Sequence, residues 1–190
     1  ILKAHKVVLA GDPFQLPPTV KSQEARRAGL GLSLLEKWVK QSSATQLLDV
    51  QYRMHQTIMG FSNARFYQGA LKADATVANW QLSIPQNDPF VFIDTAGCGF
   101  DEAINPESKS RFNKGEYFIF REYFLQMVAA LAEADAELPS MAIISPYREQ
   151  CQYMKEELAE EESLQNYLPH LDINTIDAFQ GQERDVIFIS

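Results

Sequence analysis

The sequence predicts an α/β fold in which an open, mainly parallel sheet is sandwiched by helices. Short apolar runs of strand length alternate along the chain with longer segments that have the apolar spacing of helices. Several of these runs stop abruptly at a polar cluster containing Gly, Pro or Ser, as strands do where they enter loops. Because parallel strands need a crossover between them, this alternation favours a parallel sheet covered on both faces.

Length and composition are those of an ordinary globular chain. The chain has 190 residues, 46% of them hydrophobic and 22% charged, enough for one sizeable core or for one domain and part of another. No apolar run approaches the ~18 residues that span a bilayer, and no signal peptide is recognisable, so we expect an intracellular protein, cytoplasmic or nuclear. Because the chain starts at Ile1 and stops within an apolar run, we expect a piece of a longer protein.

The charge is unevenly distributed. The net charge is −8, but residues 1–72 carry ten Lys and Arg against four Asp and Glu, whereas residues 73–190 carry seven against twenty-one. Overall acidity argues against a large non-specific nucleic-acid surface, while a basic face in the first third stays possible. Cys98 and Cys151 are far apart and lack metal-ligand spacing, which favours reduced thiols and no metal site built by this chain alone.

The first third of the chain is organised around the loop Gly11–Pro18. It directly follows a predicted strand, residues 6–10, and the paired prolines Pro17 and Pro18 are expected to stiffen its exit. A helix follows over residues 30–39, with Ser33 as N-cap and Glu36 completing a capping box. A short strand over residues 46–50 then leads through a polar cluster, residues 51–55, into a helix ending near Phe66, where His55 is expected to cap or pack.

The remaining elements continue the alternation. We expect irregular chain over residues 69–89, a strand at 90–94 and a mobile loop at 97–113, followed by a long helix from Lys114 to about Ala136. Strands are then expected at 141–144, 172–176 and 185–190, with an acidic amphipathic helix at 149–166 between the first two.

Four polar clusters fall at the ends of predicted strands: residues 11–18, 51–55, 145–148 and 175–184. Each cluster alone is compatible with a plain turn or helix start. Together and in this order they are much more specific, because ligands of open α/β sheets bind beyond the carboxyl ends of the strands.

The four clusters resemble motifs of a known family. Gly11–Pro18, Gln51–His55, Ser145–Arg148 and Thr175–Asp185 are similar to motifs of the superfamily 1 helicases of the up-frameshift and immunoglobulin-mu-binding type, and Asp94–Gly99 also fits the latter subgroup. The resemblance covers nearly the whole chain and implies a RecA-like (P-loop NTPase-type) fold. It implies that residues 1–45 are the end of a first RecA-like domain and 46–190 a second one, truncated before its final arginine motif.

The resemblance implies an ATP site between the two domains, with Gln15 and Arg53 as catalytic residues. The Gln15 amide can donate to a γ-phosphate oxygen and accept from the attacking water. Arg53 would act as an arginine finger, because its planar fork matches the charge on the transferring phosphoryl group. Asp12 would hold the Gln15 loop or the water shell of the metal.

Three further residues would bind the nucleotide. Tyr52 would stack on the base, and Glu183 would accept from a ribose hydroxyl. Gly181 would let the backbone approach the nucleotide closely, since it has no Cβ.

The third cluster and Thr175 would contact single-stranded DNA or RNA. Ser145 and Thr175 would supply hydroxyls to phosphates, Tyr147 a ring for stacking, and Pro146 lies between them. The implied activity is ATP-dependent 5′ to 3′ movement along a single strand.

Parts of such a motor are absent from the sequence. Neither the phosphate-binding loop Gly-x-x-x-x-Gly-Lys-Ser/Thr nor the acidic Mg²⁺ motif occurs, so both are expected before Ile1, and the chain alone should not hydrolyse ATP. The expected cofactors are ATP and Mg²⁺, and the expected partners are nucleic acid and the first RecA-like domain. Apolar surface on residues 1–45 predicts self-association. A catalytically dead RecA-like scaffold and an unrelated nucleotide-binding regulator remain alternatives.

Overall fold

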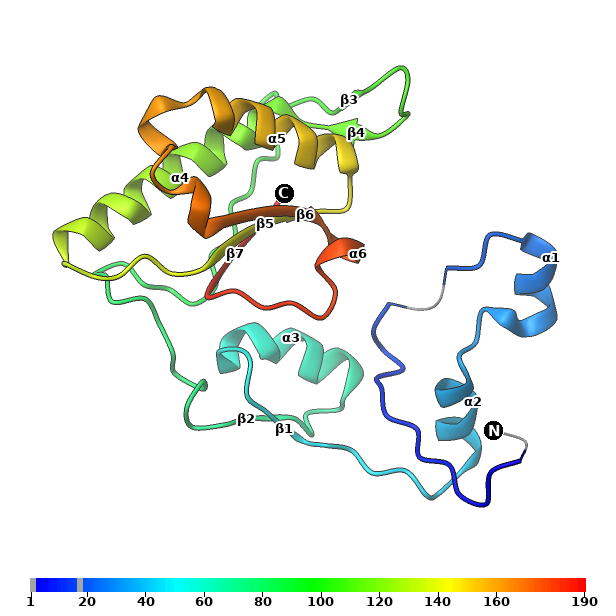
Figure 1. Ribbon diagram of the computed structural model, residues 1–190. Coiled ribbons are helices and arrows are strands. Elements are labelled where there is room, and N and C mark those ends of the chain that lie inside the picture. Colours follow the sequence, from blue (N-terminus) through cyan, green and yellow to red (C-terminus); the bar gives the residue numbers. More distant parts are fainter. Residues whose placement is uncertain (1–2, 17–18) are drawn as a thin grey trace.

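A three-stranded parallel sheet forms the centre of the molecule (Figure 1). The computed structural model describes residues 3–16 and 19–190, so Pro17 and Pro18 lie outside the described residues. The strands are β5 (Met141–Ser145), β6 (Leu171–Thr175) and β7 (Val186–Ile189), in the order β6-β5-β7. All three were predicted from the sequence, and their parallel pairing supports the predicted α/β fold.

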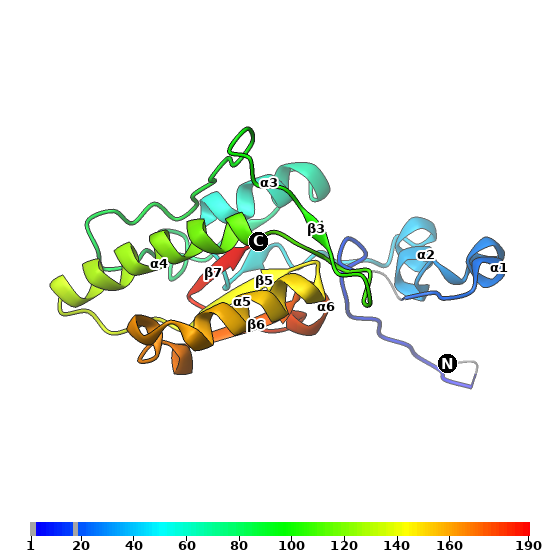
Figure 2. The same cartoon turned by 90° about the horizontal axis from the view of Figure 1, so that it is seen from above.

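Helices α4 (Lys114–Glu133) and α5 (Arg148–Glu160) cover one face of this sheet (Figures 1 and 2). Alternate strand residues point to that face and join the helices in the core, as the two-residue period of a strand requires. The largest fully buried side chains there include Phe124, Leu131, Met141, Ile143, Met154 and Leu158. Helix α3 (Gln56–Phe66) lies on the other side of the sheet in Figure 1, and the short helix α6 (Ile176–Phe179) directly follows the carboxyl end of β6.

Helix α4 begins where the sequence predicts. The Asn113 side chain accepts a hydrogen bond from Gly115 N at 2.9 Å, which caps the first turn. Gly115 is required by close packing, because a Cβ there would come within 2.3 Å of the Phe100 ring. The helix ends at Glu133, slightly earlier than expected, and the acidic helix α5 gives way after Glu160 to a 3₁₀ turn at Glu162–Leu164.

The first third of the chain lies beside this body (Figure 1). It contains α1 (Gln23–Ala25), the adjoining π-helical turn Arg26–Leu30 and α2 (Leu34–Gln41). The predicted N-cap of α2 is confirmed, since Ser33 Oγ accepts from Glu36 N at 3.1 Å. The Glu36 side chain pairs with Lys40 at 2.9 Å, so it does not complete the capping box.

Two predicted strands are wrong. Residues 6–10 and 90–94 have no strand pairing, and they expose large apolar side chains, Val8 at 79% among them. A strand is stable only with a hydrogen-bonded neighbour, and no described segment pairs with either run. The strand predicted at residues 46–50 is reduced to β1 (Val50–Gln51), which pairs in parallel with β2 (Lys72–Ala73) across α3.

The region predicted as a mobile loop, residues 97–113, contains a short hairpin instead. Its strands are β3 (Ala103–Ile104) and β4 (Arg111–Phe112), paired antiparallel. The connection between them is bound to helix α5, because Asn105 Nδ2 and Ser108 Oγ donate to the Glu149 carboxylate at 2.6 and 2.9 Å. A further short 3₁₀ helix, Leu168–His170, leads into β6. Within the described ranges, no helix has the length and apolar character needed to cross a membrane.

Candidate functional site

Asp12 organises the loop between residues 11 and 16. Its Oδ1 accepts from Phe14 N at 3.0 Å, and its Oδ2 accepts from the Gln15 side-chain amide at 3.2 Å. Gln15 N also donates to the Asp12 carbonyl at 3.4 Å, which closes a tight turn. Of the two roles expected for Asp12, holding the loop is the one for which the structure supplies contacts.

The same loop contacts the end of helix α3. Tyr67, the C-cap residue of α3, donates its hydroxyl to Asp12 Oδ2. The Phe14 ring stacks on Phe66 with 5.7 Å between centroids and meets Tyr67 edge-on at 5.4 Å. Burial, and then the neighbouring Asp12 carboxylate, raise the pKa of Tyr67 to about 12, so its hydroxyl stays protonated and able to donate at neutral pH.

Gln51 shapes the second cluster. Its Oε1 accepts from the backbone N–H groups of Arg53 and Met54 at 2.8 and 2.9 Å, and its Nε2 donates to the Met54 carbonyl at 2.7 Å. The closed turn leaves Tyr52 68% exposed and directs the Arg53 side chain into solvent. Gln51 was not singled out in the sequence, although its place before Tyr52 and Arg53 in the cluster could have suggested such a role.

Helix α3 begins immediately after this turn. His55 is buried and caps the helix, with its Nδ1 accepting from Thr57 N at 3.0 Å. This confirms the expectation that His55 caps or packs.

Arg53 forms an ion pair with Glu183 from the fourth cluster, 130 residues later in the chain. Arg53 Nε lies 3.1 Å from Glu183 Oε2, and both side chains are largely exposed. The structure therefore brings together one predicted catalytic residue and one predicted nucleotide-binding residue. Gln15 is hydrogen-bonded to Asp12 but, among the described residues, neither forms a hydrogen bond or ion pair with Arg53.

Gly181 and Glu183 lie on the loop between α6 and β7. Gly181 has a φ of 85°, a left-handed conformation that favours glycine, and a Cβ at this position would meet nothing within 4 Å. The loop is held by Arg184, whose guanidinium bonds Asp172 and lies 5.5 Å above the Phe179 ring. The backbone at Gly181 is thus open to solvent beside a fixed turn.

The nucleic-acid candidates lie at the carboxyl ends of neighbouring strands. Ser145 of β5 and Thr175 of β6 are register partners, and Pro146 and Tyr147 follow at the exposed edge. Ser145, however, has no exposed surface, and its Oγ accepts from Tyr147 N at 3.2 Å. The expected direct contact from Ser145 to a phosphate does not fit this arrangement, in which Ser145 shapes the turn that carries Tyr147.

Gln150 is a second residue that was not singled out in the sequence. It is 2% exposed, accepts from Asn113 N at 2.7 Å and donates to Ser190 Oγ at 2.9 Å. It links the start of α4, the first turn of α5 and the end of β7, directly behind the Ser145–Tyr147 turn. A glutamine among the apolar positions of an amphipathic helix was the available sequence signal.

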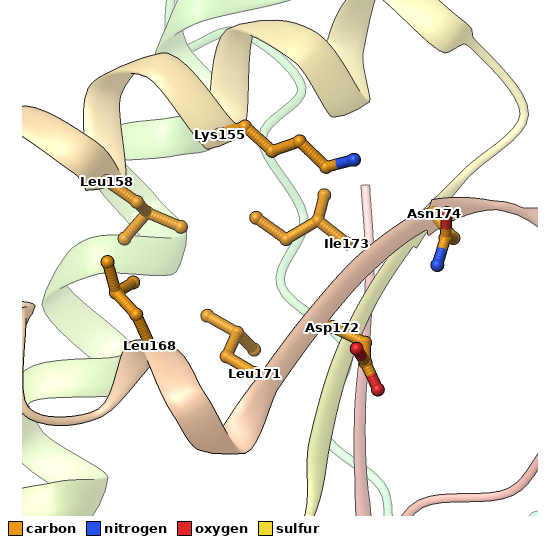
Figure 3. Close-up of a pocket in the computed structure, with 7 residues that line it drawn as sticks. All are labelled: Lys155, Leu158, Leu168, Leu171, Asp172, Ile173 and Asn174. Carbon is orange, nitrogen blue, oxygen red and sulfur yellow. The ribbon is translucent and has the colours of Figure 1, made fainter.

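One pocket of about 320 Å³ opens beside β6 (Figure 3). Its lining combines polar and apolar side chains, namely Lys155, Asp172, Asn174, Leu158, Leu168, Leu171 and Ile173. None of the predicted site residues is among them. Throughout residues 3–16 and 19–190, no group of three His, Cys, Asp or Glu side chains is placed to hold a metal ion.

Comparisons with known proteins identify the family. Residues 30–190 match the family model described as an AAA domain. The chain is 36% identical to DNA-binding protein SMUBP-2 of Mesocricetus auratus, covering 100% of this chain and 19% of that protein. It is 35% identical to DNA polymerase alpha-associated DNA helicase A of Saccharomyces cerevisiae, covering 98% and 29%, and 38% identical to Helicase SEN1 of the same yeast, covering 97% and 8%.

This chain therefore spans less than a third of the length of these relatives. In each of these comparisons the match covers 97% or more of this chain. The resemblance predicted from the clusters is confirmed, and the chain belongs to the AAA-domain family of superfamily 1 helicases.

Proposed function

We propose that this chain is part of an ATP-driven motor that moves 5′ to 3′ along single-stranded DNA or RNA. The observation that carries the proposal is the Arg53–Glu183 ion pair, because it joins the second and fourth polar clusters at one place on the surface. Both side chains are exposed, so a phosphate group can compete for Arg53 without displacing packed core residues. The names of two relatives, each containing the word helicase, agree with this function.

In this proposal Arg53 stabilises the charge that develops on the transferring phosphoryl group. Its planar fork presents N–H donors at fixed angles. The hydrogen bonds between the Gln51 side chain and the backbone of Arg53 and Met54, which we call the Gln51 clamp, fix the backbone from which this fork extends. Gln15 supplies an amide on the other loop, which can donate to a γ-phosphate oxygen and accept from water. Asp12 sets the orientation of that amide through the hydrogen bond between them.

Tyr52, Gly181 and Glu183 are proposed to hold the rest of the nucleotide. The exposed Tyr52 ring is available to stack on the base. The Gly181 backbone is open to close approach, and the Glu183 carboxylate can accept from a ribose hydroxyl. These residues fit the chemistry of a nucleoside triphosphate.

The described residues do not fit Mg²⁺, since they contain no suitable group of ligands. The sequence also lacks the phosphate-binding loop. We therefore assign the Mg²⁺ ligands and the phosphate-binding lysine to residues outside this chain. ATP hydrolysis is proposed for the complete protein.

Nucleic acid is proposed to cross the carboxyl edge of the sheet. Tyr147 can stack on a base, and Pro146 lies beside it on the exposed turn. The Thr175 hydroxyl can reach a phosphate, while Ser145 positions the turn from below. Since nucleic acid is the substrate, we place the protein inside the cell.

The test is Arg53→Ala in the complete motor protein. An arginine finger contributes about 10³-fold or more to turnover, so ATP hydrolysis should fall by that order while single-strand binding is retained. Arg121→Ala is the matched control. Arg121 of α4 is also ion-paired, at 2.7 Å with Glu161 at the end of α5, away from the predicted site residues, so its removal should leave turnover unchanged. Normal turnover in Arg53→Ala would overturn the assigned role.

We further propose that residues 1–45 belong to a first RecA-like domain and residues 46–190 to a second. Exposed apolar side chains on the first segment support this division, because they leave a surface that needs covering: Val7, Val8, Phe14, Leu16, Leu30, Leu32, Leu34, Trp38 and Val39. In the complete protein the first domain would cover this surface, and in the isolated chain a second copy would.

Sedimentation at several concentrations tests this idea. The 190-residue chain should associate as its concentration rises, and substituting exposed apolar residues such as Leu30 and Trp38 with Ser should abolish the association. Ile187→Ser is the control, because Ile187 is also exposed but lies on β7. A chain that remains monomeric at every concentration would contradict the proposal.

A further inference from the structure

The hydroxyl of Tyr67 reaches across 55 residues of sequence to the loop that carries Gln15. It donates to Asp12 Oδ2, the same oxygen that accepts from the Gln15 side-chain amide. The other oxygen of Asp12 accepts from Phe14 N. One carboxylate therefore joins the end of helix α3 to both the backbone and the side chain of the loop.

Tyr67 is itself rigidly placed. Its N–H donates to the Asn63 carbonyl at 3.1 Å, and the Asn63 side chain makes two hydrogen bonds to the Leu71 backbone, at 2.9 and 3.0 Å. Gln68 and Gly69 complete the helix end in left-handed conformations. These hydrogen bonds tie the chain after α3 back to the helix, and they hold Tyr67 in place at its end.

At its opposite end, α3 starts three residues after Arg53, with His55 as its N-cap. The eleven residues of α3 form a rod about 16 Å long, because each helical residue rises about 1.5 Å. The Gln51 clamp and the His55 cap fix its first turn to Arg53, and Tyr67 fixes its last turn to the Gln15 loop. One helix thus connects the Gln15 loop to the base of Arg53.

We propose that Tyr67 is a positioning residue that couples Gln15 to Arg53, by latching the Asp12 loop onto helix α3. The ring packing of Phe14 against Phe66 brings the two elements together but does not orient the Gln15 amide. The Tyr67 hydroxyl orients the Gln15 amide, because both groups donate to Asp12 Oδ2 and the hydroxyl occupies one side of that oxygen. The latch involves only residues of this chain. Its effect on turnover rests on the function proposed above.

Tyr67→Phe is the test of the latch, since it removes the hydroxyl and keeps the ring. Hydrogen–deuterium exchange on the 190-residue chain should show the amides of Phe14 and Gln15 exchanging about fivefold faster, as expected when one hydrogen bond of about 1 kcal/mol is lost. Amides within α3 should keep their wild-type rates, which shows that the variant is folded. Unchanged exchange at Phe14 and Gln15 would overturn the latch.

Tyr123→Phe is the matched control. Tyr123 is a half-buried tyrosine on α4 whose ring meets Phe188 at 6.4 Å, far along the chain from the loop. Removing its hydroxyl should leave exchange in residues 11–16 unchanged. Faster loop exchange in both variants would show a general loosening and overturn the specific role of Tyr67.

The coupling is tested by steady-state ATP hydrolysis in the complete protein. Tyr67→Phe should lower kcat about tenfold, the order expected from misplacing a catalytic group, and should leave the KM for ATP within about twofold. A loosened loop with unchanged kcat would overturn the coupling. If the wild-type protein does not hydrolyse ATP, the proposed function fails, while the exchange experiment still decides the latch.

Discussion

Arg53 and Glu183 meet at the surface with 3.1 Å between Nε and Oε2, although 130 residues separate them. The pair connects the turn before α3 to the loop before β7. Its side chains are 52% and 70% exposed, so water and salt screen the attraction between them. The pair therefore marks where two clusters meet, and it contributes little to holding the fold together.

The first prediction concerns the stability of that pair. Glu183→Ala should change the free energy of unfolding by less than about 1 kcal/mol, because exposed ion pairs rarely contribute more. Urea unfolding of the chain followed by circular dichroism measures this change. Glu107→Ala, at another exposed loop glutamate, provides the reference. A loss above about 2 kcal/mol would show that the Arg53–Glu183 contact is structural.

The second prediction concerns nucleic-acid binding at the sheet edge. Tyr147→Ala should weaken the affinity for a single-stranded oligonucleotide by about tenfold, since stacking on an aromatic ring contributes about 1–3 kcal/mol per base. Tyr147→Phe should bind like the wild type, because the ring is kept. Fluorescence anisotropy at fixed salt is the measurement.

Phe118→Ala controls for the loss of any exposed aromatic ring, since Phe118 lies on α4 and is 56% exposed. It should bind as the wild type does. Equal weakening by Phe118→Ala and Tyr147→Ala would argue against a specific stacking site at Tyr147.

The third prediction concerns Gln150, which is buried and bonded to Asn113 and Ser190. Gln150→Ala should destabilise the chain by about 2 kcal/mol, because it leaves the Asn113 N–H without its partner in the interior. Gln152→Ala on the exposed side of the same helix should cost no more than about 0.5 kcal/mol. Both are measured by urea unfolding, and equal effects would refute a special role for Gln150.

The fourth prediction concerns pH. The hydrogen bond from Arg121, and then that from Ser163, hold the pKa of Glu161 below its ordinary value of 4.5. A carboxyl group with a lowered folded-state pKa stabilises the fold above its unfolded pKa, and this stabilisation is lost as pH falls through the folded pKa. Glu161→Gln should therefore destabilise the chain at pH 7, with the difference from wild type shrinking below pH 4.5.

Urea unfolding of both proteins at a series of pH values measures this difference. In an Arg121→Ala background the same substitution should have a much smaller effect, because the main partner is gone. A difference that is independent of pH between 3 and 7 in the wild-type background would rule out the Glu161–Arg121 contact as its source.

Helices were predicted more successfully than strands. The helix starts at Ser33, His55 and Asn113 follow from capping and apolar spacing within a few residues of sequence. Residues 6–10 and 90–94 have the same apolar character as β5, yet neither is paired. Strand formation depends on a neighbour that local sequence does not specify.

The candidate site divides in the same way. The sequence revealed the residue types in the four clusters and the family to which the chain belongs, because each cluster is a short contiguous stretch of sequence. The burial of Ser145, the clamp made by Gln51 and the contact between Tyr67 and Asp12 were not.

The sequence by itself determined the α/β class, the sheet strands β5, β6 and β7, and the identity of the groups available for chemistry. Only the tertiary structure decided which of those groups meet. Arg53 reaches Glu183, and Asp12 reaches Tyr67, through contacts between segments far apart in the chain. Such contacts depend on how helices pack on the sheet, which local propensity and spacing do not encode.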